Sequence, residues 1–536
     1  MPALLREGGG MWRGAYTDQG GKGYVRDPRS ELFVLAVALF AGEETSAETA
    51  AAREHRYTLL VRRLAVEDPE WTAGLLSWLR GSAHVRRASL VGAAAYVKAR
   101  LDAGATGGPA NRGVVDSVLQ RADEPGALLA HWTATYGRAL PKPVKRGVAD
   151  AVRRLYHGRS LLKYDTAAQE FRFGDVLNLT HATPDPAKPW QGDLFRHALD
   201  RRHRPARAVP PASVPVLGAH RELMELPVAA RRPAVTAAGG AERLARAGLT
   251  WEALAGWLQG PLDAAAWEAI IPSMGPMALV RNLRNFDGAG VSDEVAARVA
   301  ERISDPEAVA ASRQFPFRYL AAYRHAPSAR WAEPLERALG HSLANVPALP
   351  GRTLVLVDRS GSMWEPLSER SQLNRADAAA VFGTALALRA EAADLVQFGS
   401  YSHRVRYERG EGVLRVLERF RELGGTETTA AVVRHYDRHD RVLIITDEQA
   451  APHGRLGHPA SRIPSRVPVY TWNLGGHRVG HLPTDLPTRH TFGGLGDAAF
   501  RMVPLLEAGL RGAWPWLADD YRSTTRLVEN AGGSSS

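Results

Sequence analysis

Residues 353–362 read TLVLVDRSGS, so that five apolar or β-branched residues run directly into an aspartate and two serines. The apolar run is typical of a strand that is buried on both faces of a parallel sheet. Asp358, Ser360 and Ser362 alternate behind it, and parallel sheets bind their ligands at the carboxyl ends of the strands. We therefore expect a binding site with oxygen ligands in this loop.

Two further segments supply matching groups. Residues 441–445, RVLII, end in Thr446-Asp447-Glu448, and Gly424-Gly425-Thr426 offers another hydroxyl on a turn. Carboxylate and hydroxyl oxygens suit Mg²⁺, which prefers octahedral geometry and keeps several waters. With few carboxylates and no histidine in these loops, the pattern predicts a metal site open to an outside acidic group rather than a hydrolytic centre. A capped turn without metal is the alternative interpretation.

The sequence around these motifs alternates between strand and helix patterns. Strands are expected at Thr353–Val357, Asp394–Phe398, Arg441–Ile445 and Val467–Trp472, and helices at Arg375–Glu391 and Val413–Leu423. Strands that alternate with helices through short turns specify a parallel sheet covered on both faces. This C-terminal part is therefore predicted to be an α/β domain.

The first 345 residues show a different pattern. Apolar residues recur at three- and four-residue spacing, as in Tyr57, Leu60 and Leu64, and short breakers separate the segments. Many short helices joined by tight turns favour an α-solenoid. The tryptophans at helical spacing are expected in its core: Trp71, Trp78, Trp251, Trp257 and Trp267. The Pro- and Arg-rich residues 203–234 are expected to form a long irregular excursion.

The composition excludes several classes of chemistry. The chain has 536 residues, no cysteine, and 68 Lys+Arg against 57 Asp+Glu. Without cysteine, disulfides, thiol nucleophiles and cysteine-ligated metal sites are impossible. The longest apolar run, Leu32–Ala41, is too short to span a bilayer, and no secretory signal pattern is visible. We therefore expect a cytoplasmic protein without membrane contact.

Most of the excess positive charge lies in residues 138–207, which carry 15 Lys+Arg and seven Asp+Glu. A focused basic patch attracts polyanions and speeds their association. Lys145, Arg146, Arg153 and Arg154 are spaced so that they could share one face of a predicted helix. A solvated face in an arginine-rich protein is the other interpretation, and charge alone does not separate the two.

With these motifs in order, residues 351–512 resemble a von Willebrand factor A domain with a metal-ion-dependent adhesion site. The resemblance implies that one divalent metal ion, Mg²⁺ in the first place, is coordinated directly or through water by five residues: Asp358, Ser360, Ser362, Thr426 and Asp447. It also implies that an acidic residue of a partner protein completes the coordination.

An A domain behind a long helical solenoid resembles the Ro autoantigen family, whose TROVE module is a closed ring of HEAT-like helices. Four short motifs carry the likeness: Leu140-Pro141 before Lys145-Arg146, then Lys163-Tyr164, DVLNLTH at Asp175–His181 and ALVRNL at Ala278–Leu283. The composition favours a bacterial member. The resemblance implies a helical ring over residues 1–345, the A domain over 346–512, and an extension over 513–536 whose last residues are disordered.

The resemblance further implies a protein that binds RNA and has no catalytic activity of its own. Ro rings bind small noncoding Y RNAs on a basic outer surface and single-stranded 3′ ends of misfolded or immature RNAs in a central hole. In bacteria the family acts with an exoribonuclease, through Y RNA, in RNA quality control, maturation or stress-associated decay. The residues implied for RNA contact are Lys142, Lys145, Arg146, Arg153, Arg154, Lys163, Arg172 and His181.

The sequence departs from the family pattern after His181, where Ala182-Thr183-Pro184 stands in place of the usual Leu-Lys-Pro. Because a lysine is lost there, contacts with single-stranded RNA are expected to be weaker or redistributed. Arg281 and Asn282 are expected to hold helices together rather than to touch RNA.

Two other functions stay open at this point. The chain could be a protein-interaction scaffold whose A domain binds an acidic partner through Mg²⁺, with no role for RNA. It could also be a metal-dependent ribonuclease that uses Asp358, Asp447 and Glu448. The sequence contains no phosphate-binding loop of the G-x-x-x-x-G-K-[ST] type, which argues against nucleotide hydrolysis.

Overall fold

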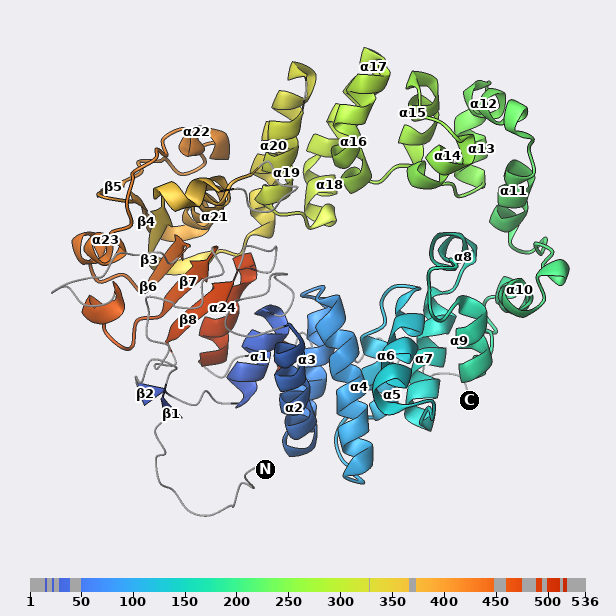
Figure 1. Cartoon of the computed structure of the whole chain (residues 1–536), viewed down its shortest axis with the longest axis horizontal. Coiled ribbons are helices and arrows are strands. Elements are labelled where there is room, and N and C mark those ends of the chain that lie inside the picture. Colours follow the sequence, from blue (N-terminus) through green and yellow to red (C-terminus); the bar gives the residue numbers. More distant parts are fainter. Residues whose placement is uncertain are drawn as a thin grey trace.

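The computed structural model describes residues 15–16, 22–23, 28–38, 50–326, 328–365, 373–447, 459–474, 488–493, 499–510 and 514–517. Helices make up most of the chain to residue 345, and an α/β domain follows (Figure 1). An antiparallel ribbon of β1 (Ala15–Tyr16) and β2 (Lys22–Gly23) precedes the first helix and was not expected from the sequence. No helix in these ranges has the length and apolar character needed to cross a membrane.

Ten helices form the lower half of the molecule in Figure 1. Their bounds are α1 Pro28–Ala38, α2 Ala50–Glu67, α3 Pro69–Gly81, α4 Arg86–Asp102, α5 Asn111–Ser117, α6 Glu124–Tyr136, α7 Lys142–Leu155, α8 Gly158–Tyr164, α9 Phe173–Thr180 and α10 Trp190–His203. Each packs mainly on helices close in sequence, as α2 does on α4 and α5 on α7. This pattern of local packing is that of an α-solenoid.

The next ten helices pass from the right of Figure 1 across its upper half. Their bounds are α11 Pro215–Met224, α12 Val228–Thr236, α13 Gly240–Arg246, α14 Trp251–Leu258, α15 Ala264–Ile270, α16 Pro276–Ala289, α17 Asp293–Ser304, α18 Pro306–Ser312, α19 Pro316–His325 and α20 Ala332–Ser342. Four of the five tryptophans expected in the core are buried, and Trp251 is half-buried.

The Pro- and Arg-rich residues 203–234 are more regular than their composition indicated. They contain a 3₁₀ turn, η1 (Pro205–Arg207), all of α11 and most of α12. Pro215 occupies the first position of α11. Since the fixed φ of proline suits the first helical turn, a proline that looks like a breaker here begins a helix.

The α/β domain contains one six-stranded sheet in the order β5-β4-β3-β6-β7-β8. The strands are β3 Leu349–Asp358, β4 Ala390–Phe398, β5 Ser402–Arg404, β6 Arg441–Thr446, β7 Val469–Asn473 and β8 Arg489–Gly493. All neighbours are parallel except β5, which is antiparallel to β4. The sheet is therefore mixed rather than wholly parallel, because the tight turn after β4 allows only an antiparallel partner.

Among its described residues this domain has four α-helices: α21 Arg375–Arg389, α22 Val413–Leu417, α23 Thr428–His435 and α24 Ala499–Leu510. Two of them are shorter than the sequence predicted. The helix expected to reach Glu391 ends at Arg389, because Ala390 already pairs with Leu349 of β3. The helix expected to reach Leu423 ends at Leu417, because the Leu423 N–H bonds to the Arg359 carbonyl at 2.9 Å. In both cases pairing at the sheet outweighs helix propensity.

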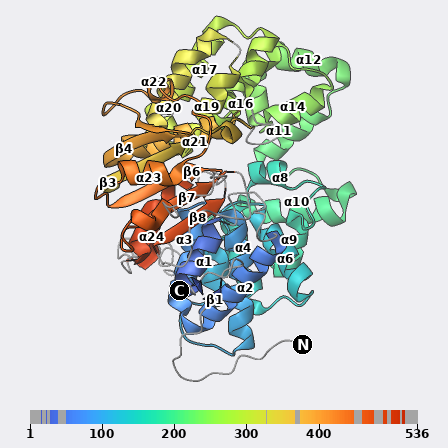
Figure 2. The ribbon, with the colours of Figure 1, turned by 60° about the vertical axis from the view of Figure 1, so that its left-hand side comes forward.

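The α/β domain joins the two ends of the helical part, so that the elements form a closed circuit (Figures 1 and 2). On one side α19 packs against α21, and on the other α24 packs against α1. At the second contact Arg501 donates to the Ser82 carbonyl at 2.8 Å. Arg313, between α18 and α19, bonds to His84 between α3 and α4. The circuit therefore closes through the α/β domain, with the Arg313–His84 bond as a direct contact between the two helical segments.

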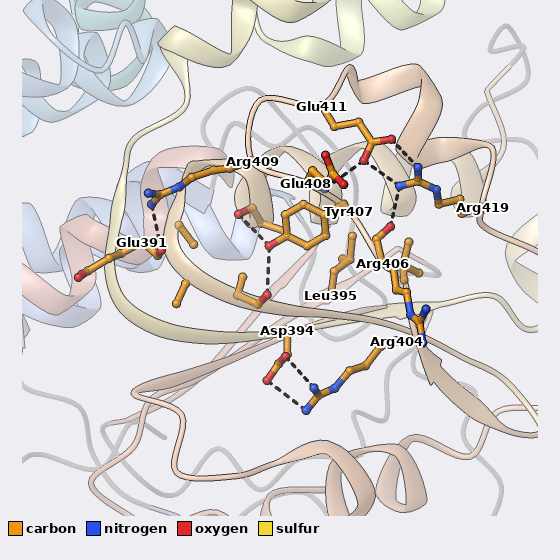
Figure 3. Close-up of a pocket in the computed structure, with 15 residues that line it drawn as sticks. Glu391, Asp394, Leu395, Arg404, Arg406, Tyr407, Glu408, Arg409, Glu411 and Arg419 are labelled. Atoms are coloured by element: carbon orange, nitrogen blue, oxygen red, sulfur yellow. Dashed lines mark hydrogen bonds and ion pairs between the residues drawn. The ribbon is translucent and has the colours of Figure 1, made fainter.

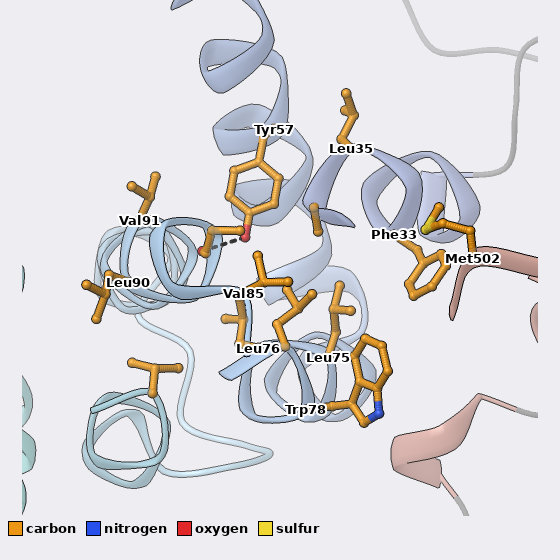
Figure 4. Packing of buried hydrophobic residues seen from close by; sticks show 14 of the residues in the cluster. Phe33, Leu35, Tyr57, Leu75, Leu76, Trp78, Val85, Leu90, Val91 and Met502 are labelled. Atoms are coloured by element: carbon orange, nitrogen blue, oxygen red, sulfur yellow. Dashed lines mark hydrogen bonds between the residues drawn. The ribbon is translucent and has the colours of Figure 1, made fainter. Parts of the chain in front are cut away.

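Residues 514–517, which we call the strap, seal the second contact. Its 3₁₀ turn η8 (Pro515–Leu517) packs on α3. The Trp516 ring lies 5.3 Å from Trp71 and 5.4 Å from Trp78 between ring centroids. Phe33 and Met502 come together at the same place (Figure 4). The strap thus continues the core of the first helices into the α/β domain.

Candidate functional site

The carboxyl end of β3 forms the centre of the candidate metal site. Asp358, the last residue of β3, is fully buried. Its Oδ1 accepts a hydrogen bond from the Ser360 N–H at 2.8 Å, and its Oδ2 accepts one from the Thr446 hydroxyl at 2.5 Å. Thr446 ends β6, the parallel neighbour of β3. The ends of the two strands therefore meet, as the sequence pattern predicted.

Asp358 sits in an environment that disfavours its charge. Burial raises the pKa of Asp358 to about 7, and the nearby charge of Asp447 adds to the increase. Asp447 follows β6 directly and is also fully buried. A divalent cation is favoured beside two buried carboxyl groups that repel each other, because it compensates both charges.

Hydroxyl groups gather beside this pair. Ser360 Oγ lies 3.4 Å from Ser362 Oγ. The Ser360 backbone pairs with Gly424, and the Gly361 N–H donates to the Gly424 carbonyl at 2.8 Å. This contact brings the turn that carries the half-buried Thr426 next to the loop after β3. All five expected ligands therefore lie on segments that the fold brings together.

The donor set fits Mg²⁺ better than a softer metal. In the described ranges no group of three or more His, Cys, Asp or Glu residues is placed to hold a metal ion. A metal at this loop would therefore depend on hydroxyl and water oxygens beside two carboxylates, which is the chemistry of Mg²⁺ sites. Glu448, part of the ribonuclease alternative, lies outside the described residues.

Sequence reasoning missed three residues of this site. Ser400 Oγ accepts a hydrogen bond from the Gly425 N–H at 2.8 Å and so holds the turn before Thr426. The Thr428 hydroxyl is buried without a hydrogen-bond partner in the part of the chain that the structure describes. Ser400 could have been predicted from its position two residues after the end of β4, next to the carboxyl ends of the neighbouring strands.

The third residue is Arg359, which stands between two expected ligands. Its side chain is buried, lies 4.6 Å from the Trp364 ring and donates to the Ala376 carbonyl at 2.7 Å. Burial lowers the pKa of Arg359 to about 10. These contacts fix the loop against α21 and so position Asp358 and Ser360, the residues on either side of Arg359.

The basic segment places a group of unpaired cations at the start of α7. Lys142 and Arg146 are exposed, and Lys145 is half-buried. Within the described residues none of these three side chains has an ion-pair or hydrogen-bond partner, and the same holds for the exposed Arg138 just before α7. We call these four residues the α7 patch. Arg138 is an addition to the residues expected from the sequence.

The other arginines of the expected RNA surface are engaged within the protein. Arg154 pairs with Asp116 of α5 at 2.8 Å. Arg153 donates to the Thr183 carbonyl at 2.8 Å. Arg172 forms two hydrogen bonds with the buried Asp165, at 2.6 and 3.2 Å. The spacing of the residues predicted the helix correctly but not the partners of these arginines, which lie outside that helix.

Of the remaining motif residues, Lys163, His181 and Arg281 are exposed and Asn282 is buried. Lys163 lies 5.2 Å from the centre of the Tyr164 ring. His181 ends α9 in the left-handed region, with φ of 54°. Asn282 is buried and donates to the Ala278 carbonyl at 2.8 Å within α16, so this bond does not join two helices. Arg281 is exposed and has no partner within the described residues, so it does not hold helices together.

The fold and these sites define a class of protein: a closed circuit of helices completed by an α/β domain with an oxygen-rich loop at the carboxyl ends of its central strands. Residues 235–340, from the end of α12 to α20, match the TROVE domain family. The Ala278–Leu283 motif lies inside this range. This segment of the chain is therefore similar to TROVE domains, in agreement with the resemblance to the Ro family.

Most of the chain is also similar in structure to the Ro protein (RSR) of Deinococcus radiodurans. The likeness covers 91% of this chain and 100% of that chain, with 18% sequence identity and a TM-score of 0.66. At this identity the two proteins share their fold, including both the helical part and the α/β domain. No curated protein was found to match the chain by sequence.

Proposed function

We propose that this chain is an RNA-binding protein of the Ro type, and that the α7 patch contacts RNA phosphates. The observation that carries the proposal is the group of four neighbouring cations, Arg138, Lys142, Lys145 and Arg146, without a counter-charge in the described chain. Unpaired cations on a rigid helix bind phosphates without first breaking an internal ion pair. The match to the TROVE family supports RNA as the polyanion.

The RNA that best suits this patch is a small structured noncoding RNA of the Y RNA class. A helix face contacts such a duplex through its phosphates, because the deep groove of A-form RNA excludes side chains. We further propose that the ring takes up single-stranded 3′ ends of misfolded or immature RNA, with Lys163 and His181 exposed for such contacts. In this role the protein cuts nothing and presents RNA to an exoribonuclease for quality control, maturation or decay under stress.

We propose in addition that the α/β domain binds Mg²⁺ through Asp358, Ser360, Ser362, Thr426 and Asp447. A bound ion would offer a coordination position to an acidic side chain of a partner protein. The buried carboxyl pair beside the two serines supports this docking role. The same carboxyl pair supports a second candidate function, that of a metal-dependent protein scaffold that does not bind RNA.

The RNA proposal is tested with the triple variant Lys142→Ala/Lys145→Ala/Arg146→Ala. The probe is a synthetic stem-loop RNA with a single-stranded 3′ tail, titrated over a range of KCl concentrations. Removing three phosphate contacts should weaken binding on the order of 100-fold and reduce the slope of log affinity against log salt by about 2 to 3.

A matched triple variant controls for the loss of charge. Arg63→Ala/Arg221→Ala/Arg298→Ala removes three exposed arginines that form helix ion pairs with Glu67, Glu225 and Glu294. It should leave the RNA affinity nearly unchanged. Equal losses in both variants, or an affinity independent of salt, would contradict the α7 patch. Absence of RNA binding, with a partner protein released by chelator, would favour the scaffold.

A further inference from the structure

A cavity of about 860 Å³ opens beside β4 in the α/β domain (Figure 3). Its walls are the first half of β4, the segment that follows β5, and Arg419. The sheet register places it away from the metal loop, since Asp394 in its wall lies beside Leu354 whereas Asp358 lies beside Phe398. The cavity is therefore separate from the candidate metal site.

One wall of the cavity is an uncovered sheet edge. β5 pairs only with Val396–Phe398 of β4. The Leu395 carbonyl accepts a hydrogen bond from the Val405 N–H at 2.8 Å, so the odd-numbered residues of β4 face this edge. Glu391 and Ala393 therefore direct both N–H and C=O toward the cavity, and no strand of the described chain covers them.

Side chains donate hydrogen bonds to the main-chain carbonyl groups of this edge, whereas no side chain of the described residues accepts from its N–H groups. The Tyr407 hydroxyl donates to the Ala393 carbonyl at 3.1 Å, and Arg409 donates to the Glu391 carbonyl at 3.0 Å (Figure 3). An added β-strand would need both the carbonyls and the N–H groups of the edge. With the carbonyls taken, the edge suits a ligand that only accepts hydrogen bonds.

The cationic side chains in the cavity are incompletely satisfied. The Arg406 guanidinium is exposed and has no partner within the described residues. Arg409 contacts a main-chain carbonyl and no carboxylate. Arg404 is 55% exposed and forms an ion pair with Asp394 at 3.4 Å. Within the described residues Arg406 and Arg409 are thus the two arginines of the cavity that have no carboxylate partner.

The carboxylates of the cavity do not cancel this charge. Three of the four already accept hydrogen bonds: Asp394 from Arg352 and His439 at 2.9 Å, Glu411 from Arg419 at 2.8 Å, and Glu391 from the Gly351 N–H at 2.7 Å. Among the lining residues only the carboxylate of Glu408 has no such donor. The unengaged groups are therefore predominantly cationic donors.

We propose that this cavity binds a small phosphate-bearing ligand of nucleotide size. Its phosphate would accept hydrogen bonds from the N–H groups of Glu391 and Ala393 and from the guanidinium groups of Arg406 and Arg409. Guanidinium forks and main-chain N–H groups are the usual donors to phosphate. The volume lies in the range of small-molecule sites, with the half-buried Tyr407 as an apolar wall. Both a free nucleotide and the terminal phosphate of an RNA have this chemistry.

Calorimetric titration of the full chain with three probes tests the proposal: inorganic phosphate, adenosine 5′-monophosphate, and a 5′-phosphorylated trinucleotide. We expect saturable binding of one nucleotide per chain, weakened at least about 10-fold by Arg406→Ala, which removes a charged hydrogen bond. Glu408→Gln should strengthen binding, because it removes a like charge. Arg406→Ala should unfold at the wild-type temperature, since the Arg406 guanidinium forms no hydrogen bond or ion pair in the described chain.

Arg284→Ala is the matched control, because Arg284 is an exposed arginine of α16 without a partner in the described chain. It should leave the titration unchanged. Equal binding of the monophosphate and the trinucleotide supports a free nucleotide as occupant, and preference for the trinucleotide supports an RNA end. No saturation by any probe up to about 10 mM, or equal binding by Arg406→Ala, would overturn the site. The α7 patch variant should bind these probes normally, so that this test is independent of the RNA proposal.

Discussion

Replacing Trp516 with alanine is expected to lower the free energy of unfolding by about 3 to 5 kcal/mol, the range for truncating a large aromatic side chain in a core. Trp516 is 2% exposed and contacts Trp71, Trp78 and Phe33 of the first helices. Its loss leaves a cavity between these helices and the α/β domain. Thermal unfolding of the variant measures the loss.

The effect should concentrate where the circuit closes. Hydrogen exchange is expected to rise in α1, α3 and α24, which meet at the strap. Gly74→Leu should produce the same result, because a Cβ at Gly74 would lie 2.5 Å from Trp516 Cδ1 and would displace the ring. Trp516→Ala changes the strap and Gly74→Leu changes the α3 surface on which it packs. Agreement between the two variants would therefore show that this contact closes the circuit.

Trp257→Ala provides the comparison. Trp257 is buried in a second core cluster, formed by helices from α11 onward together with parts of the α/β domain. Its truncation should also destabilise the protein, but the rise in hydrogen exchange should stay in α12–α15. If Trp516→Ala raised exchange evenly over the whole chain, or left α1 and α24 protected, the strap would not be what closes the circuit.

The helical N-terminal part and the position of the loop after β3 could be predicted from the sequence because both depend on local patterns. A three- to four-residue apolar period predicts a helix, and TLVLV followed by alternating oxygen side chains predicts a strand with a loop site. The structure confirms the helical N-terminal part and the α/β sheet. Asp358 and Ser360 lie at the strand end where the pattern placed them.

What the sequence could not show are contacts between distant segments. Arg153, Arg154 and Arg172 look like free cations until Thr183, Asp116 and Asp165 are brought to them by folding. Residues 418–423 have a helical pattern, yet the chain leaves the helix to pair with the loop after β3. The packing of the strap on the first helices could not be predicted for the same reason, since the residues that it contacts lie more than 400 positions earlier in the sequence.

Asp358→Asn is expected to stabilise the metal-free protein at high pH while it abolishes stabilisation by Mg²⁺. The pKa of Asp358 is about 7 in the folded chain against an ordinary value of 3.8. Between these values the folded state keeps a proton that the unfolded state loses, so stability falls as pH rises from about 4 to 7 and stays reduced above 7. The full effect corresponds to about 4 kcal/mol, because each pKa unit is worth about 1.4 kcal/mol.

Asparagine removes this dependence and keeps the local hydrogen bonds. Its amide oxygen can accept from the Ser360 N–H, and its NH₂ group can donate to the Thr446 hydroxyl. In chelator the variant should therefore unfold at a higher temperature than the wild type at pH 8, with little difference at pH 4. With Mg²⁺ in excess the wild type should gain stability by mass action and the variant should not.

Ser362→Ala separates stabilisation by Mg²⁺ from the pH dependence that is caused by burial of Asp358. It removes one hydroxyl from the proposed Mg²⁺ site but leaves the buried carboxyl group of Asp358 in place. It should weaken stabilisation by Mg²⁺ and preserve the wild-type dependence of stability on pH in chelator.

Equal gains from Mg²⁺ in the wild type and in Asp358→Asn would place the ion elsewhere. A metal-free Asp358→Asn less stable than the wild type at pH 8 would mean that the carboxylate is compensated within the fold. The stability curves in chelator and in Mg²⁺ therefore test the cost of burying Asp358 separately from the identity of the group that offsets it.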